Sequence, residues 1–139
     1  MSKLLLLLLF VFVQNLTYNN LTVYDSDRLE KLMGNVATLN VNEGDEFYIR
    51  FIVNPSILMD WTFLNSNEFS DALQSMGYST ERRGGWRVLG AGAYRYYKFK
   101  ALKPSINQIA LKFQQIIRIS NEINDLVIKI NILKKDQTS

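Results

Sequence analysis

The residue types that this sequence lacks limit its chemistry more than those it contains. Its 139 residues include no His and no Cys. The usual general base near neutral pH, the commonest metal ligand and any thiolate nucleophile are therefore missing. Most hydrolytic mechanisms, cysteine-based zinc sites and disulfides are excluded or made awkward by these two absences. A binding protein without metal or cofactor is the default expectation, and an enzyme is the least favoured class.

One group of carboxylates deserves comparison with known cation sites. Glu43, Asp45 and Glu46 surround Gly44 at a predicted turn. The residues lack the Asp-x-Asp-x-Asp-Gly spacing that a calcium loop requires. Surface acidic side chains at turns are common without a bound ion. The sequence therefore predicts a solvated hairpin turn here and no metal site.

Two further patterns are typical of proteins that bind ligands with phosphate groups. The segment Leu89–Gly92 is rich in glycine, but a phosphate-binding loop needs Lys and Ser or Thr after its last glycine, and Ala93–Arg95 follows instead. Basic and aromatic residues alternate between Arg82 and Lys100, as in proteins that stack single-stranded nucleic acid. The net charge of the whole chain is only +3, which is small for a nucleic-acid binder. Neither nucleotide nor nucleic-acid binding is predicted.

The N-terminus has the pattern of a secretory signal peptide. Lys3 supplies a positive charge, and the ten residues Leu4–Val13 are all apolar. This stretch is too short for a transmembrane helix, which needs about 20 apolar residues. We expect residues 1–17 to form the signal peptide, with cleavage between Gln14 and Asn19. The destination is then the secretory pathway, either outside the cell or in the lumen of lysosome-like or phagosomal vesicles.

Two acceptor sequences for N-glycosylation follow the apolar stretch. They begin at Asn15 and Asn20, and each continues with Leu and Thr. Asn20 lies beyond the predicted cleavage site and is the candidate glycosylation site. A secreted chain without Cys must be held together by packing of its core alone.

The remainder of the chain, residues 18–139, is predicted to form one all-β domain. Apolar residues alternate with polar ones in successive short runs, which is typical of strands with one buried face. These runs cover residues 37–41, 47–53, 60–64, 97–101, 109–113 and 126–132. Ser26–Met33 and Glu68–Met76 compete as short helical turns. Short strands separated by turn residues favour an immunoglobulin-like β-sandwich or a barrel.

The order of these motifs resembles the chagasin-like inhibitors of papain-type cysteine peptidases, which include the amoebiasins. Asn54–Ser56 follows one strand, Trp61 begins the next, and Leu89–Gly92 precedes a basic aromatic strand. The resemblance extends from about Asn35 to Leu133. It implies an immunoglobulin-like β-sandwich, a monomer, and three loops at one end that form a wedge. In the family this wedge enters the peptidase cleft and blocks it reversibly.

Matching the family's loop motifs to this sequence gives the candidate binding residues. The first loop, Asn-Pro-Ser/Thr-Thr-Gly-aromatic in the family, matches at its first three positions only. The second, Gly-x-Gly-Gly, matches except for its last glycine, and the third, Arg-Pro-Trp, is absent. The implied peptidase-binding residues are Asn54, Pro55, Ser56, Ile57, Leu58, Met59, Gly90, Ala91, Gly92, Gln115, Ile116 and Ile117.

The departures from the family motifs leave two functions open. An interface Trp is often worth about 2 kcal/mol or more, so having Ile117 in its place weakens the expected binding. The apolar residues Ile57, Leu58 and Met59 instead suit an apolar surface on the partner. A reversible inhibitor of papain-like cysteine peptidases is the first hypothesis. A binding or adhesion module of the same fold that does not inhibit peptidases is the alternative.

Overall fold

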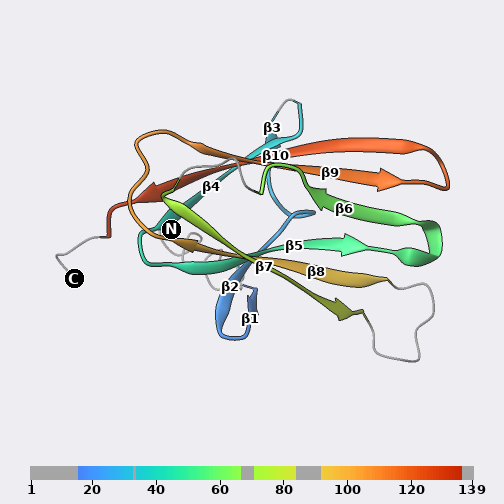
Figure 1. Cartoon of the computed structure of the whole chain (residues 1–139), viewed down its shortest axis with the longest axis horizontal. Coiled ribbons are helices and arrows are strands. Elements are labelled where there is room, and N and C mark those ends of the chain that lie inside the picture. The colour runs from blue at the N-terminus through green and yellow to red at the C-terminus, as the bar shows by residue number, and fades with distance from the viewer. Residues whose placement is uncertain (1–15, 33, 67–70, 84–91, 136–139) are drawn as a thin grey trace, which may run out of the picture.

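The protein is a sandwich of two five-stranded β-sheets (Figure 1). The computed structural model describes residues 16–32, 34–66, 71–83 and 92–135. The first sheet has the spatial order β1 (Thr17–Tyr18), β2 (Leu21–Asp25), β5 (Glu46–Val53), β8 (Ala93–Ala101) and β7 (Leu73–Arg82). The second has the order β3 (Lys31–Leu32), β4 (Val36–Asn42), β10 (Glu122–Leu133), β9 (Ile109–Ile117) and β6 (Met59–Phe63). The predicted all-β sandwich is confirmed.

The strand directions bring three connections to one end of the sandwich. Strand β5 leads to β6 through the short 3-10 turn η1 (Pro55–Ile57), β7 leads to β8, and β9 leads to β10. The ends of β5, β7 and β9 and the starts of β6, β8 and β10 lie at the right-hand end of Figure 1. The β4–β5 turn at Gly44 and the β8–β9 connection lie at the opposite end, where the Gly44 N–H donates to the carbonyl of Ala101 over 2.8 Å. The fold therefore gathers the three connections that contain the candidate residues.

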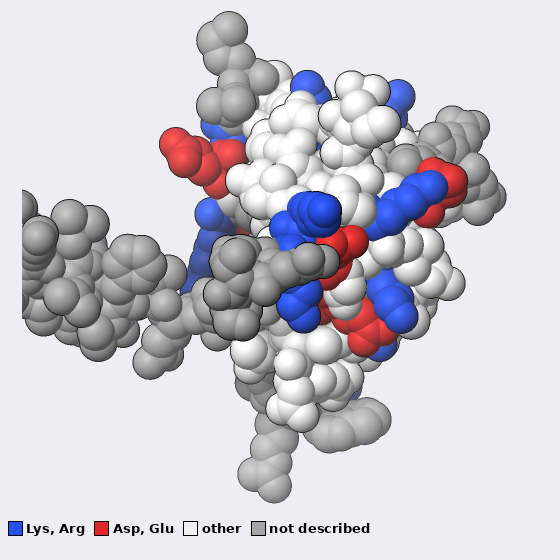
Figure 2. All heavy atoms as spheres, turned by 90° about the vertical axis from the view of Figure 1, so that its left-hand side faces the viewer, with Lys and Arg blue, Asp and Glu red and all other residues white. Residues whose placement is uncertain are grey.

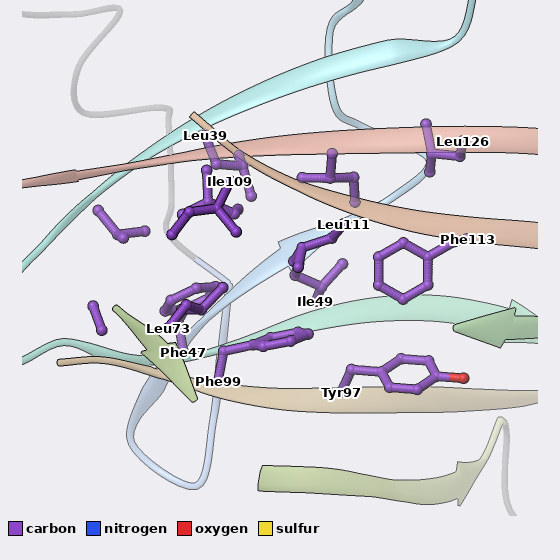
Figure 3. Close-up of a cluster of buried hydrophobic side chains, with 14 of the residues drawn as sticks. Leu39, Phe47, Ile49, Leu73, Tyr97, Phe99, Ile109, Leu111, Phe113 and Leu126 are labelled. Carbon is purple, nitrogen blue, oxygen red and sulfur yellow. The ribbon is translucent and has the colours of Figure 1, made fainter. Parts of the chain in front are cut away.

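The core between the sheets follows from the alternation in the sequence. Side chains two residues apart point to the same face of a strand, and Phe47, Ile49 and Phe51 of β5 are all essentially inaccessible to solvent. They pack against the inner faces of the opposite sheet, as Figure 3 shows for Leu111 and Phe113. Each fully buried side chain of this size contributes about 1.5–3 kcal/mol to folding. This packing holds the strands behind the loops in fixed positions.

The outer face of the first sheet is also partly buried, which the sequence pattern did not predict. Tyr48 and Arg50 of β5 alternate with core residues and were expected on a wet face, yet they are only 6% and 9% exposed. The reason is that the β1–β2 hairpin folds over this face. The ring of Tyr18 stacks on that of Tyr96, with centroids 4.0 Å apart. The buried Arg50 guanidinium pairs with the carboxylate of Asp25 and lies over the Tyr94 ring at 4.0 Å.

Burial of tyrosines predicts a loss of stability at alkaline pH. Burial is the main reason that the pKa values of Tyr24, Tyr96 and Tyr97 are raised above their ordinary value. The unfolded chain therefore loses these protons first as the pH rises through about 10. The contribution of the tyrosines to stability is complete below that pH and falls above it. We expect denaturant midpoints to decrease between pH 9 and 11, with a smaller decrease in Tyr97→Phe.

The two segments predicted as possible helical turns differ from that expectation. Residues 26–28 form a turn, and Lys31–Leu32 is a strand. Met33 of the first segment lies outside the described residues. In the second, residues 68–70 lie outside the described residues, and Leu73–Met76 begins strand β7. Pairing with β8 is favoured over a helix there because Leu73 and Ala101 are buried opposite each other. Within the described ranges, no helix has the length and apolar character needed to span a membrane.

Candidate functional site

The first loop is a closed turn between β5 and β6. The backbones of Asn54 and Met59 form two hydrogen bonds, each 2.9 Å long. Within the turn the side-chain oxygen Oδ1 of Asn54 accepts hydrogen bonds from the backbone N–H of Ser56 at 3.1 Å and from its hydroxyl at 2.6 Å. Pro55 fixes its own φ, and Leu58 ends the turn with an N–H bond of 3.1 Å to the carbonyl of Pro55. The loop is therefore held in one shape by its own residues.

Leu58 is more exposed than the neighbouring Ile57 and has an unusual backbone conformation. Its φ is 55°, in the left-handed region that favours glycine. Its side chain is 56% exposed, and that of Ile57 is 39% exposed. An exposed apolar side chain contributes little to folding, and a positive φ at a residue other than glycine costs free energy. Neither feature of Leu58 therefore stabilises the folded state. Strain of this kind is concentrated at functional sites.

Leu58→Gly is expected to stabilise the fold while weakening binding by the loop. Glycine adopts positive φ without the penalty of about 1–2 kcal/mol that an L-residue experiences. Part of that gain is offset by the greater freedom of glycine in the unfolded chain. We expect the free energy of unfolding to rise by about 0.5–1 kcal/mol in a denaturant titration. An unchanged or lower value would show that the Leu58 side chain contributes to the folded state.

Gly92, the described residue of the second loop's motif, lies directly against the first loop. Gly92 has a φ of 78°, and a Cβ atom placed on it would lie 2.5 Å from the carbonyl oxygen of Val53 and 3.3 Å from Cβ of Asn54. The Gly92 carbonyl accepts a 3.0 Å hydrogen bond from the N–H of Arg83, at the other side of the same loop. Gly92 therefore lets the base of the second loop touch the base of the first. Gly90 and Ala91, predicted to bind the partner, lie outside the described residues.

The third loop differs from the sequence prediction. Gln115, Ile116 and Ile117 were assigned to a loop, but they are the last residues of strand β9 and pair with Trp61, Asp60 and Met59 of β6. The apolar alternation ends at Phe113, yet hydrogen bonding continues the strand to Ile117. The turn itself spans residues 118–121, where Asn121 adopts a φ of 56°.

The exposed residues of this hairpin were missed by the sequence prediction. Ile119 in the turn is 68% exposed, and Ile123 at the start of β10 is 62% exposed. The available signal was the polar run Ser120–Glu122, which lies between Ile119 and Ile123. Such a group predicts a turn, and it would have placed the loop a few residues later.

The first and third loops are joined by a hydrogen bond and enclose a hollow. The N–H of Arg118 donates to the carbonyl of Leu58 over 3.1 Å. Beside this bond lies a hollow of about 380 Å³, whose lining includes Pro55, Leu58 and Ile116. Of the predicted binding residues in the described ranges, the fold thus brings Asn54–Met59, Gly92 and Gln115–Ile117 together at one end. Gln115–Ile117 lie in strand β9 just before the turn, where Ile117 pairs with Met59 and the Gln115 side-chain amide donates to the Met59 sulfur over 3.4 Å.

An ion pair supports the base of the first loop. Nη1 of Arg95, on β8, donates to Asp60 at 2.6 Å and to the carbonyl of Trp61 at 2.8 Å. Burial opposes the charge of Arg95, but Asp60 and Tyr97 more than compensate, so that its pKa lies above the ordinary value. Arg95 remains charged at any working pH. The pair links the two sheets where the loops begin.

Two carboxylates of the β4–β5 turn accept hydrogen bonds from backbone N–H groups. Asp45 accepts a 2.9 Å hydrogen bond from the N–H of Asn42, and Glu43 accepts one of 3.0 Å from the N–H of Lys135. In the part of the chain that the structure describes, no group of three or more Asp, Glu, His or Cys residues is placed to hold a metal ion.

Comparison with known proteins connects this geometry to two solved structures. Neither protein-family models nor curated proteins match the sequence. The solution structure of amebosin matches with a TM-score of 0.50 and 12% identity, over 80% of this chain and 96% of that one. The structure of PbICP-C in complex with falcipain-2 matches with a TM-score of 0.53 and 14% identity, over 80% of this chain and 98% of PbICP-C.

These likenesses cover nearly the whole of both neighbours, so they concern a complete domain and not a shared hairpin. At this level of identity they establish the fold, and the loops of this chain must be judged on their own geometry. The chain therefore has the immunoglobulin-like, chagasin-like β-sandwich fold that its sequence predicts, and it shares this fold with amebosin and PbICP-C.

Proposed function

We propose that this protein is a reversible, non-covalent inhibitor of papain-like cysteine peptidases. The observation that carries the proposal is the single contiguous surface formed by the first and third loops and by Gly92, with Leu58 and Ile119 exposed on it. PbICP-C, which has the same fold, was solved in complex with falcipain-2. Blocking a cleft requires shape and apolar contact and no catalytic group, which suits a chain without His or Cys.

The first loop is suited to occupy a cleft without being cut. A peptidase binds its substrate in an extended conformation, in which the strand backbone pairs with the cleft. In the first loop the backbone of Asn54 and Met59 is already paired with itself, and η1 keeps the residues between them folded. Because the loop is held before binding, little conformational entropy is lost on association. These features favour tight binding and resist cleavage.

A binding module that does not inhibit peptidases is the second candidate. The specific observation in its favour is the sequence at the loop end: Ile57 and Leu58 stand where the family motif has Thr-Gly, and neither the strand end Gln115–Ile117 nor the turn at 118–121 contains Arg-Pro-Trp. The exposed apolar residues would then contact a different protein surface. Recovery of only non-peptidase ligands by the immobilised protein, together with no inhibition, would favour this candidate.

We further propose that the protein acts in the secretory pathway, either secreted or in the lumen of lysosome-like or phagosomal vesicles. Of residues 1–17, the predicted signal peptide, residues 1–15 lie outside the described residues. The carbonyl of Leu16 accepts a 2.7 Å hydrogen bond from the N–H of Val23, and Thr17 belongs to β1. A mature chain that keeps these contacts begins at Leu16 or earlier, which places the cut at the N-terminal side of the predicted range between Gln14 and Asn19 and shortens the proposed signal peptide from residues 1–17 to residues 1–15 or fewer. Mass measurement of the exported chain tests this start.

The direct test is a titration of the mature protein, from Leu16 to Ser139, into papain and into a cathepsin L-type peptidase. Residual activity is followed with a fluorogenic peptide, and the inhibitor is checked afterwards by mass for cleavage. We expect inhibition at nanomolar concentrations, with one inhibitor bound per peptidase and the inhibitor recovered intact. Absence of inhibition at micromolar concentrations by folded protein, against both enzymes, would contradict the proposal.

A further inference from the structure

The β1–β2 hairpin presents a built acceptor site for an N-linked glycan, away from the loops of the candidate site. Asn20 and Thr22 carry the amide and the hydroxyl of the acceptor sequence Asn-Leu-Thr. Asn19 and Asn20 form the turn of the hairpin with φ values of 50° and 64°. Two successive positive φ values are typical of a tight hairpin turn, whose central residues project into solvent. Asn20 is accordingly exposed.

The hairpin that carries Asn20 is a firm part of the folded domain. β2 pairs in parallel with β5 from Thr22 opposite Phe47 to Asp25 opposite Arg50. β1 is held by the Tyr18 ring, which stacks on Tyr96 at 4.0 Å and meets the edge of Tyr48 at 5.2 Å. Removal of β1 would expose these buried rings. Asn20 is therefore expected to remain in the mature protein, whichever bond before Leu16 is cut.

The position of Asn20 leaves the candidate binding site free. Thr22 lies opposite Phe47, so Asn20 lies level with the start of β5, beside Gly44. The first loop follows Val53, at the other end of this eight-residue strand. At about 3.3 Å per residue, the two sites are about 25 Å apart along the sheet.

The surroundings of Asn20 are polar and leave room for a sugar. A hollow of about 460 Å³ adjoins Asn20, and its lining includes Tyr24, Glu46 and Lys100. Figure 2 views the end of the sandwich opposite the loops, and there Lys and Arg are interspersed with Asp and Glu. Such a surface suits a hydrated carbohydrate better than an apolar partner.

We infer that Asn20 is N-glycosylated in the protein that passes through the secretory pathway, an inference that depends on the proposed localisation. In the transfer, the amide nitrogen Nδ2 of Asn20 forms a bond to the anomeric carbon of an oligosaccharide and releases one proton to solvent. The bond from that carbon to the pyrophosphate of a polyprenol carrier breaks, and the carrier leaves as the pyrophosphate. The glycan then stands at the side of the domain, and inhibition by the loops is retained.

The experiment is secretion of the full chain from a eukaryotic host, followed by intact mass measurement before and after treatment with a glycan-removing amidase. The test variant is Thr22→Val, which removes the acceptor hydroxyl but keeps the β-branched shape in β2. The matched control is Asn15→Gln, which removes the other acceptor sequence. We expect the wild type and Asn15→Gln to carry a removable glycan, and Thr22→Val to carry none. Deamidation of Asn20 to Asp by the amidase marks the site.

The outcomes separate this inference from the proposals on which it depends. If the secreted chain has the mass of the unmodified protein, the inference that Asn20 is glycosylated is wrong. It is also wrong if the glycan persists in Thr22→Val and disappears in Asn15→Gln. Failure of the full chain to leave the cell contradicts the proposed localisation; fusion to a leader of known function then still tests the acceptor site. Glycosylated protein that no longer inhibits, while the amidase-treated protein does, overturns the placement of the glycan away from the loops.

Discussion

Replacing Leu58 with Asp is expected to raise the inhibition constant for a papain-like peptidase by about 100-fold, which corresponds to about 2.7 kcal/mol. The side chain is 56% exposed in the free protein, and the proposed complex buries it in the peptidase cleft. A carboxylate moved from water to an apolar contact without a partner is costly. The measurement is the titration of papain and the cathepsin L-type enzyme by each variant.

The substitution is well suited to separate binding from folding. Asp tolerates positive φ better than Leu does. The φ of 55° at this position therefore does not destabilise the folded state of the variant relative to that of the wild type. The free energy of unfolding is therefore expected to change by less than about 0.5 kcal/mol, as for most surface substitutions. A loss of inhibition in a protein of unchanged stability then reports the contact itself.

Ile106→Asp is the matched control. Ile106 is 99% exposed, in the β8–β9 connection at the opposite end of the sandwich. It undergoes the same change from an apolar side chain to a carboxylate, and it is expected to leave inhibition unchanged. Equal losses in both variants would point to a general effect of charge on association. Unchanged inhibition in Leu58→Asp would remove the first loop from the interface.

The sequence predicted the strands of the core well because the two faces of each strand differ from each other in polarity. Phe47, Ile49 and Phe51 alternate with polar residues, and only one register buries all three. The same rule misplaced Tyr48 and Arg50, since it assumes that one face of the sheet is wet. The hairpin that covers this face is distant in the sequence and too short to show a pattern of its own.

The sequence predicted the first loop of the candidate site but misplaced the third loop, for a related reason. The first loop is defined by local chemistry: Pro55 and the side chain of Asn54 set its shape, and both can be read from the sequence. The third loop is defined by where pairing between β9 and β10 ends. The polar residues Ser120–Glu122 indicate a turn, but they do not show that strand β9 extends through Ile117, which hydrogen bonding to its neighbours determines.

Gly92→Ala is expected to disturb the site by separating the first and second loops. The new Cβ would lie 2.5 Å from the carbonyl oxygen of Val53, closer than carbon and oxygen atoms approach without a bond, and the backbone φ of 78° disfavours any L-residue. Either the base of the second loop moves or the end of β5 does. We expect a loss of about 3 kcal/mol in the free energy of unfolding and at least about a tenfold weaker inhibition, because Asn54 is part of the displaced region.

Gly77→Ala isolates the effect of the backbone angle from that of the contact. Gly77, in strand β7, has a φ of 81°, and a Cβ placed on it meets nothing within 4 Å. Its expected cost is the conformational penalty alone, about 1–2 kcal/mol, with inhibition unchanged. The difference between the two variants, measured by denaturant titration and by inhibition, is the contribution of close packing between Gly92 and the first loop. Equal stability losses in both, with equal inhibition, would mean that the two loops are not held together by this contact and that rigidity at the loop end has another source.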